Sequence, residues 1–266
     1  MNEFKIKNKL GRELNTLSEW EVGFKEVDKE HWKVGYSAHS LAAFFTSGKG
    51  FAWLDELSEA LFGESIVWND AIIEHASKLD GYKGKQRMQD MALWSTLSSG
   101  ESIFVGIEAK VLESFGNSLR EEYDDAKEYQ KKNKNSKRPN RVKETTDFLF
   151  KGRTPYDEEI CNLRYQLMYY FRASILEAST YKKSKIALKE RKDRVDIVVL
   201  PILVFETEHY KTDVEKGNLN KADYEIFCKT LGLCKEIIGG KEFWVGEIDG
   251  RKIYSLYENI DLCTTL

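Results

Sequence analysis

Residues 102–111 read SIFVGIEAKV, and this largely apolar run predicts a β-strand buried inside the protein. Glu108 and Lys110 are its two charged residues, close to its C-terminal end. Stranding either charge in a low-dielectric interior would cost several kcal/mol, so both must be paired, bound to a metal ion or used in chemistry. Side chains two positions apart in a strand share a face, so we expect Glu108 and Lys110 side by side.

A second apolar run, residues 88–94, precedes this strand and contains Asp90 as its only charged residue. The connector between the two runs contains Ser98-Ser99-Gly100, which is typical of a turn. The two runs therefore predict a β-hairpin that brings Asp90 close to Glu108 and Lys110.

The same acid-x-Lys spacing occurs again at Glu3, Asp125 and Glu190, in terminal or highly charged sequence that is typical of a solvated face. The apolar surroundings, rather than the spacing, distinguish Glu108 and Lys110. A buried ion pair that fixes the strand register is the structural alternative to a catalytic pair.

The arrangement of Asp90, Glu108 and Lys110 resembles the Asp…Glu-x-Lys core of the PD-(D/E)XK nuclease superfamily. In these nucleases a helix, an antiparallel hairpin and a second helix–strand unit build one metal site. Further matches over about residues 30–260 resemble a poorly characterised bacterial family related to those nucleases. The matches are His31-Trp32-Lys33 with Ser37-Ala38, Gln89-Asp90, Glu108-Ala109-Lys110-Val111 with Glu113-Ser114-Phe115-Gly116, and Arg164-Tyr165-Gln166-Leu167.

The resemblance implies an α/β (α+β) fold with a restriction-endonuclease-like core, in which helices flank a mixed β-sheet. It also implies that Asp90, Glu108 and the backbone carbonyl of Ala109 hold Mg²⁺ or Mn²⁺. Lys110 would orient or deprotonate the attacking water, and Gln166 would support the reaction from the following helix. Contacts to nucleic acid are expected from Gln89, Arg164, Lys182 and Lys183.

The sequence departs from the family pattern at one position and leaves a second one undecided. Gln89 stands where the motif has proline, a replacement that many members of the superfamily share. The acidic residue that the first helix often adds to the metal site could be Glu56 or Glu59, or neither, since both also read as ordinary surface residues.

The formal net charge of −3 is unevenly distributed, with basic residues concentrated in segments 127–153 and 182–194. Together these segments would bind phosphates through contacts that weaken with salt. Any single lysine among them reads equally well as part of a solvated loop or helix end.

The composition bounds the class of protein. With 266 residues and 41% hydrophobic content, the chain can form one large domain with a substantial core. We expect a nuclease-like core over about residues 37–210, an N-terminal extension over 1–36, and a C-terminal helix plus β-hairpin over 219–258. No apolar run approaches the ~20 residues that span a bilayer, and no signal-peptide pattern is visible, so a cytoplasmic protein without a membrane partner is expected.

The four cysteines and four histidines lack the close spacings of a zinc site or a redox pair. Elsewhere, helices are expected over residues 37–62 with a break at 47–50, over 157–181, and over 221–231. A buried strand is expected over 196–205, and a hairpin turns at Asp249-Gly250.

The sequence therefore leads to a metal-dependent nuclease, with DNA the expected substrate and defence or restriction a role suggested by analogy alone. A homodimer is one expected state, since cutting both strands of a duplex usually needs two active sites. Three alternatives stay open: a nuclease-fold protein that binds nucleic acid without cleaving it, a protein-interaction module, and an enzyme for small phosphoesters. The sequence does not choose between DNA and RNA.

Overall fold

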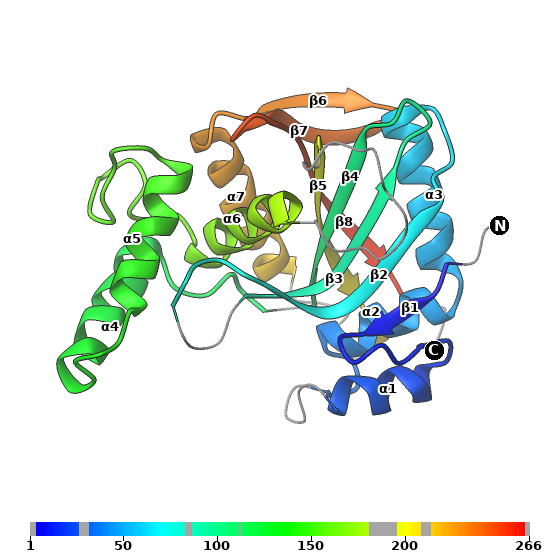
Figure 1. Ribbon diagram of the computed structural model, residues 1–266, viewed down its shortest axis with the longest axis horizontal. Coiled ribbons are helices and arrows are strands. Elements are labelled where there is room, and N and C mark those ends of the chain that lie inside the picture. The colour runs from blue at the N-terminus through cyan, green and yellow to red at the C-terminus, as the bar shows by residue number, and fades with distance from the viewer. Residues whose placement is uncertain are drawn as a thin grey trace.

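The structure is a computed structural model that describes residues 4–26, 32–82, 87–111, 113–180, 196–208 and 214–263. Within these residues eight strands form one sheet in the order β1-β2-β3-β4-β5-β8-β7-β6 (Figure 1). The strand bounds are β1 Ile6–Asn8, β2 Trp68–Ser77, β3 Arg87–Thr96, β4 Ser102–Lys110, β5 Ile197–Glu206, β6 Cys234–Ile238, β7 Lys241–Ile248 and β8 Arg251–Asp261.

The sheet is mixed. Pairing is antiparallel within β2–β3–β4 and within β8–β7–β6. It is parallel between β1 and β2, between β4 and β5, and between β5 and β8. The helices are α1 Leu17–Lys25, α2 Ser37–Thr46, α3 Lys49–Phe62, α4 Leu119–Lys132, α5 Arg138–Leu149, α6 Tyr165–Thr180 and α7 Val214–Thr230. A mixed sheet flanked by helices confirms the expected fold class.

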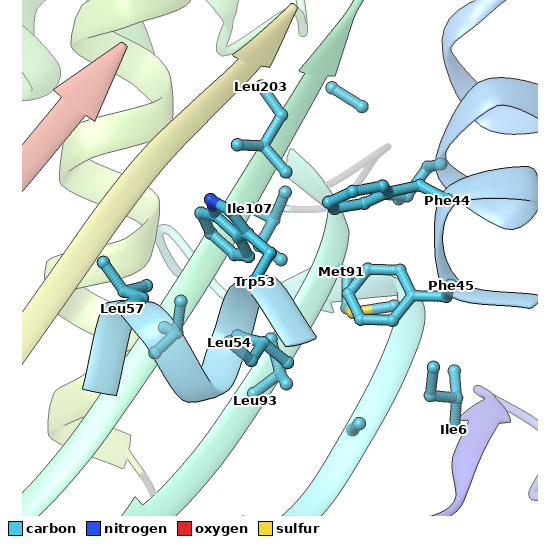
Figure 2. Close-up of a cluster of buried hydrophobic side chains, with 14 of the residues drawn as sticks. Ile6, Phe44, Phe45, Trp53, Leu54, Leu57, Met91, Leu93, Ile107 and Leu203 are labelled. Atoms are coloured by element: carbon cyan, nitrogen blue, oxygen red, sulfur yellow. The ribbon is translucent and has the colours of Figure 1, made fainter. Parts of the chain in front are cut away.

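Alternation along β4 divides the interior into two cores. Its odd-numbered residues, such as Ile103 and Ile107, pack in one core with α1, α2 and α3. Phe104 points to the other face and packs in a second core, to which α4, α5, α6 and α7 contribute. Figure 2 shows the first core, in which Phe44, Phe45, Trp53, Leu54 and Leu57 from α2 and α3 lie against Met91, Leu93, Ile107 and Leu203 of the sheet.

The helical prediction for residues 37–62 is confirmed, including its break. Gly48 lies between α2 and α3 at φ +82°, a left-handed conformation that glycine adopts without a steric penalty. The tight connection places both helices over the same face of the sheet, where their apolar residues meet.

The helix expected to begin at Asp157 begins at Tyr165 instead. The preceding residues form turns, whose carbonyl groups serve a neighbouring helix. Leu163 O accepts from Leu119 N at 2.8 Å, and Cys161 O accepts from Arg120 N at 3.0 Å. Those two donors belong to the first turn of α4, where N–H groups have no partner within their own helix.

The hairpin prediction at Asp249-Gly250 is confirmed, because β7 and β8 pair across this turn. Both turn residues have positive φ, +52° and +68°, as the tight turns of two-residue hairpins require. β8 of this hairpin pairs with β5 in the interior of the sheet, so the C-terminal residues belong to the same sheet as β4 and β5. The N-terminal segment likewise contributes β1 to the sheet edge.

The first basic segment folds largely as two helices, α4 and α5, which stand out from the sheet (Figure 1). Pro139 lies in the first turn of α5, where backbone N–H groups have no partner within the helix, so the N–H that proline lacks is not missed. The second basic segment, residues 182–194, lies outside the described residues. None of the described helices has both the length and the apolar composition needed to cross a membrane.

Candidate functional site

The regular alternation of side chains along strand β3 is interrupted at Asp90. Met91 packs in the core with α2 and α3. Gln89, two residues earlier, donates to Ser174 Oγ of α6 at 3.1 Å, on the opposite side of the sheet. Strict alternation would place residues 89 and 91 on one face, so the strand departs from regular geometry between them.

Strand β2 makes the same change opposite this point. Ile73 packs with α2 and α3, whereas His75 lies 2.8 Å from Glu177 of α6. The residue between them, Glu74, has φ +48°, which is unusual for a residue with a side chain and strained within a strand. The register pairs Ile73 with Met91 and His75 with Gln89, which sets Glu74 across from Asp90.

The change of face leaves Asp90 at the point where β3 separates from β4. Regular pairing of the two strands ends at Met91 and Ile107. Beyond it, the backbone N–H of Ala109 donates to Asp90 Oδ2 at 2.7 Å. A carboxylate thus takes the place of a backbone acceptor, and this bond holds Asp90 beside the Glu-x-Lys segment of β4.

Glu108 and Lys110 lie on the face covered by α6, with exposed fractions of only 2% and 7%. Lys110 Nζ is 3.2 Å from Glu108 Oε1. Gln166 Nε2, from the first turn of α6, donates to the same oxygen at 2.8 Å. Lys110 Nζ also lies 5.7 Å from the centre of the Phe115 ring, within range of a cation–π contact.

Close packing of α6 on β4 produces this meeting. Tyr170 OH donates to the carbonyls of Gly106 and Pro201, on β4 and β5. A side chain at Gly106 would begin 2.9 Å from Ser174 Oγ, so glycine permits the approach. Sequence reasoning missed the positioning roles of Gly106, Phe115 and Tyr170, although a glycine inside an apolar strand is a signal for close backbone approach.

Other predicted site residues lie elsewhere. Gln89 has no exposed surface and bonds to Ser174, so in this structure it does not reach a surface that nucleic acid could touch. Arg164 donates to Asp223 Oδ2 at 2.8 Å and to the Gly116 carbonyl at 3.0 Å, which ties together α7 and the loop before α4. Lys182 and Lys183 lie outside the described residues.

Neither candidate for the acidic residue that the first helix would add to the metal site lies on the Glu108 side of the sheet. Glu56 and Glu59 are exposed on α3, which covers the face opposite to Glu108 and Gln166. The interior sheet therefore separates both side chains from the Glu108 carboxylate.

The tip of the β2–β3 hairpin is tied to α5 and α6. Asp80 forms a two-bond ion pair with Arg141, with Nε to Oδ2 at 2.6 Å and Nη2 to Oδ1 at 3.1 Å. Arg172 donates to the Leu79 carbonyl at 3.2 Å. Burial is the largest single influence on the pKa of Asp80 and raises it, but the hydrogen bonds from Arg141 and the Tyr82 N–H and the positive charges of Arg141 and Arg172 together lower the pKa overall.

The oxygen donors at the site suit a hard divalent cation. Among the described residues, no group of three or more His, Cys, Asp or Glu side chains is arranged to hold a metal ion. The Asp90 carboxylate nevertheless lies against the backbone of Ala109, the residue that follows Glu108, through the bond from the Ala109 N–H. Mg²⁺ is commonly bound through one or two carboxylates, with water and substrate phosphates completing its shell, so this smaller set fits Mg²⁺ or Mn²⁺.

Comparison with known protein families gives a match over most of the chain. The model of a family described as a domain of unknown function, DUF6946, matches residues 13–256, a range that contains Asp90, Glu108, Lys110 and Gln166. No curated protein and no solved structure matches the chain. Because the matched range spans well over half of the 266 residues, the chain belongs to the DUF6946 family.

Proposed function

We propose that this protein is a metal-dependent nuclease that hydrolyses phosphodiester bonds, with DNA as its substrate. One observation carries the proposal. Asp90, Glu108, Lys110 and Gln166, which come from two strands and a helix, form a linked set around the separation of β3 and β4.

The order of elements around this set supports the proposal. Helix α3 precedes the antiparallel strands β2, β3 and β4, and α6 then leads to β5, which pairs with β4 in parallel. A helix, a hairpin and a second helix–strand unit are the parts that the resemblance to PD-(D/E)XK nucleases implies. This agreement concerns architecture, and the site residues carry the chemical argument.

In the proposed reaction Asp90, Glu108 and the carbonyl of Ala109 would hold Mg²⁺ or Mn²⁺. When bound, the ion would stabilise the negative charge that develops on the phosphoryl group. Lys110, placed by Glu108 and Phe115, would orient the attacking water by donating a hydrogen bond to it from its ammonium group. Gln166 fixes the Glu108 carboxylate through its 2.8 Å hydrogen bond.

A second candidate function is nucleic-acid binding or protein interaction without cleavage. It is favoured by the burial of Glu108 and Lys110, at 2% and 7% exposed, because a buried ion pair can serve the fold alone. The linkage of Asp90 to the same segment favours the enzyme, since a purely structural pair has no need of a second carboxylate at this point.

The proposal includes partners and a location. α4 and α5 display lysines and arginines for phosphate contacts, although some of them pair locally, as Arg138 does with Glu122 at 2.8 Å. We propose a cytoplasmic protein, since Cys161, Cys228, Cys234 and Cys263 are all free thiols. Cleavage of both strands of a duplex would call for a homodimer.

Cleavage assays test the proposal directly. Plasmid, linear duplex, single-stranded DNA and RNA are incubated with the wild-type protein and Mg²⁺ or Mn²⁺. Wild type should cut at least one substrate, and Glu108→Gln and Lys110→Met should each lose about 10²-fold or more of that activity. Glu101→Gln is the matched control, because it neutralises an exposed carboxylate just before β4 and should retain activity.

The outcomes separate the two candidate functions. Cleavage by all variants would show that the activity belongs to another site or to a contaminant. If wild type is inert but binds a duplex with an affinity that falls steeply with salt, the protein is a binding module. Absence of both cleavage and binding would reject nucleic acid as the partner.

A further inference from the structure

A second candidate site lies on the opposite side of the sheet from Glu108. A cavity of about 670 Å³ opens between the N-terminal segment, α1, α2, α3 and the start of β2. Its volume falls within the usual range for small-molecule sites, roughly 300–1,000 Å³. Because α1–α3 and α6 cover different faces, the cavity shares no residue with the Glu108 cluster.

Aromatic rings form the walls of this cavity. Phe51 contacts Phe4 and Phe45 edge to face, with ring centres 5.1 and 5.6 Å apart. Trp20 stacks on Phe45 at an interplanar angle of 15°, and the ring centres of Trp68 and Phe4 are 6.4 Å apart. Since the rings hold one another in place, the walls are formed before any ligand arrives, which suits a flat aromatic ligand.

The polar groups at the cavity indicate what such a ligand should carry. Lys5 is already paired with Glu13 at 2.7 Å. Asp55, which also lines the cavity, has no ion pair or hydrogen bond within the described part of the chain. The Trp68 indole N–H is buried, with Trp68 only 6% exposed, and it finds no acceptor among the described residues. An unsatisfied buried donor is uncommon in folded proteins and calls for an explanation.

We propose that this cavity binds a purine-type heterocycle that carries an exocyclic amino group. The flat ring lies among the aromatic side chains, and the amino group donates to the Asp55 carboxylate, a strong charge-assisted hydrogen bond. A ring nitrogen or carbonyl of the ligand accepts from the Trp68 N–H. The ligand is either a free nucleoside or a base of a single-stranded nucleic acid. The proposal stands whether or not the protein cuts nucleic acid.

Isothermal titration calorimetry of the full chain with guanosine, adenosine and inosine tests this site. Guanosine and adenosine should bind with submillimolar Kd, and inosine, which lacks the amino group, roughly tenfold more weakly. Asp55→Asn should weaken guanosine binding by about tenfold or more, because the amide presents a donor as well as an acceptor. Trp68→Phe keeps an aromatic ring, removes the N–H, and should weaken binding severalfold.

Glu56→Gln is the matched control, because it removes one carboxylate from the exposed side of the same helix and should leave the Kd within about twofold. Circular dichroism confirms that each variant is folded. A short purine-rich oligonucleotide that binds at this site more tightly than guanosine would identify a nucleic-acid base as the source, and weaker binding a free nucleoside. The proposal is overturned if no nucleoside binds, if inosine binds as well as guanosine, or if Asp55→Asn leaves the Kd unchanged.

Discussion

At the residue scale, Glu108 couples its neighbours, because one of its carboxylate oxygens accepts from Gln166 and forms an ion pair with Lys110. Both charged side chains are almost fully buried, so removing only one of them leaves the other without compensation. The balance between these two charges matters for stability whether or not the site is catalytic.

We therefore predict that Lys110→Met lowers the free energy of unfolding by about 3–5 kcal/mol. The double variant Lys110→Met/Glu108→Gln should recover much of this loss, since no buried charge is then left unpaired. Urea denaturation of the two single variants, the double variant and wild type measures the coupling. Additive losses in the double variant would contradict the prediction.

The ion pair between Asp80 and Arg141 makes the stability depend on pH. Burial, the largest single influence, raises the pKa of Asp80, but the hydrogen bonds from Arg141 and the Tyr82 N–H and the positive charges of Arg141 and Arg172 together lower it in the fold. The ionised form thus favours the folded state, so its contribution is complete above the ordinary pKa of about 3.9 and is lost as the pH falls below it.

Asp80→Asn should consequently reduce the free energy of unfolding by about 2–3 kcal/mol at neutral pH, as expected for a largely buried pair. The difference from wild type should narrow as the pH falls below about 4, because Asp80 then takes up a proton in the unfolded chain before it does so in the folded protein. Urea denaturation between pH 3 and pH 7 measures both quantities. A difference that stays constant down to pH 3 would refute the assignment, and Glu56→Gln, which alters an exposed carboxylate, provides the baseline.

At the scale of elements, the contact between α6 and β4 positions the candidate site. Gly106 allows the helix to approach the strand, and Gln166 meets Glu108 along the same contact. Gly106→Ala should push the two elements apart, because the new methyl group would lie 2.9 Å from Ser174 Oγ and 3.1 Å from Phe104 Cε1.

For Gly106→Ala we predict a stability loss of about 1–3 kcal/mol, the usual cost of overpacking. Activity should fall further than stability explains, because the bond from Gln166 to Glu108 would lengthen. Cleavage rates measured at a temperature where the variant is still fully folded test this separation. Combining the variant with Ser174→Ala, which frees space next to the methyl group, should restore part of the loss. Normal activity in a destabilised Gly106→Ala protein would show that the helix position does not control the site.

Element prediction succeeded where local sequence decides the structure. The turn at Asp249-Gly250 and the break at Gly48 were both predictable, because positive φ values favour these residues. The start of α6 was not, because the turns before Tyr165 are stabilised by bonds to the first turn of α4, far away in the sequence. The proximity of Asp90 to the Glu-x-Lys segment followed from the hairpin, whereas the change of strand face at Asp90 did not.

On the scale of the whole molecule, the sheet joins the expected core to the N-terminal segment and to the C-terminal hairpin, which sequence reasoning placed outside that core. β5 pairs with β4 on one side and with β8 on the other. Local patterns identify β8 as a strand, but they carry no information about its partner, since parallel pairing joins residues distant in sequence. From the sequence, the C-terminal hairpin was therefore expected to lie outside the nuclease-like core. In the structure it completes the sheet.

A chain that ends at Gly232 should not fold, because it lacks β6, β7 and β8 and exposes one edge of the buried strand β5. We expect such a protein to be aggregated or to show no cooperative unfolding by circular dichroism. A cooperative transition in the truncated chain would demonstrate an independent domain over residues 1–232 and would contradict the prediction. The full chain, which should unfold in a single transition, is the reference.

The interior position of β8 also constrains how the protein is made. Ribosomes synthesise the chain from its N-terminus, so β4 and β5 emerge long before residues 251–261, which cover the remaining edge of β5. During this interval an apolar strand has an unpaired edge, the kind of surface that chaperones bind and that promotes aggregation. We thus expect nascent chains stalled before residue 251 to remain sensitive to protease and to associate with chaperones, and to become resistant only once β8 has left the ribosome.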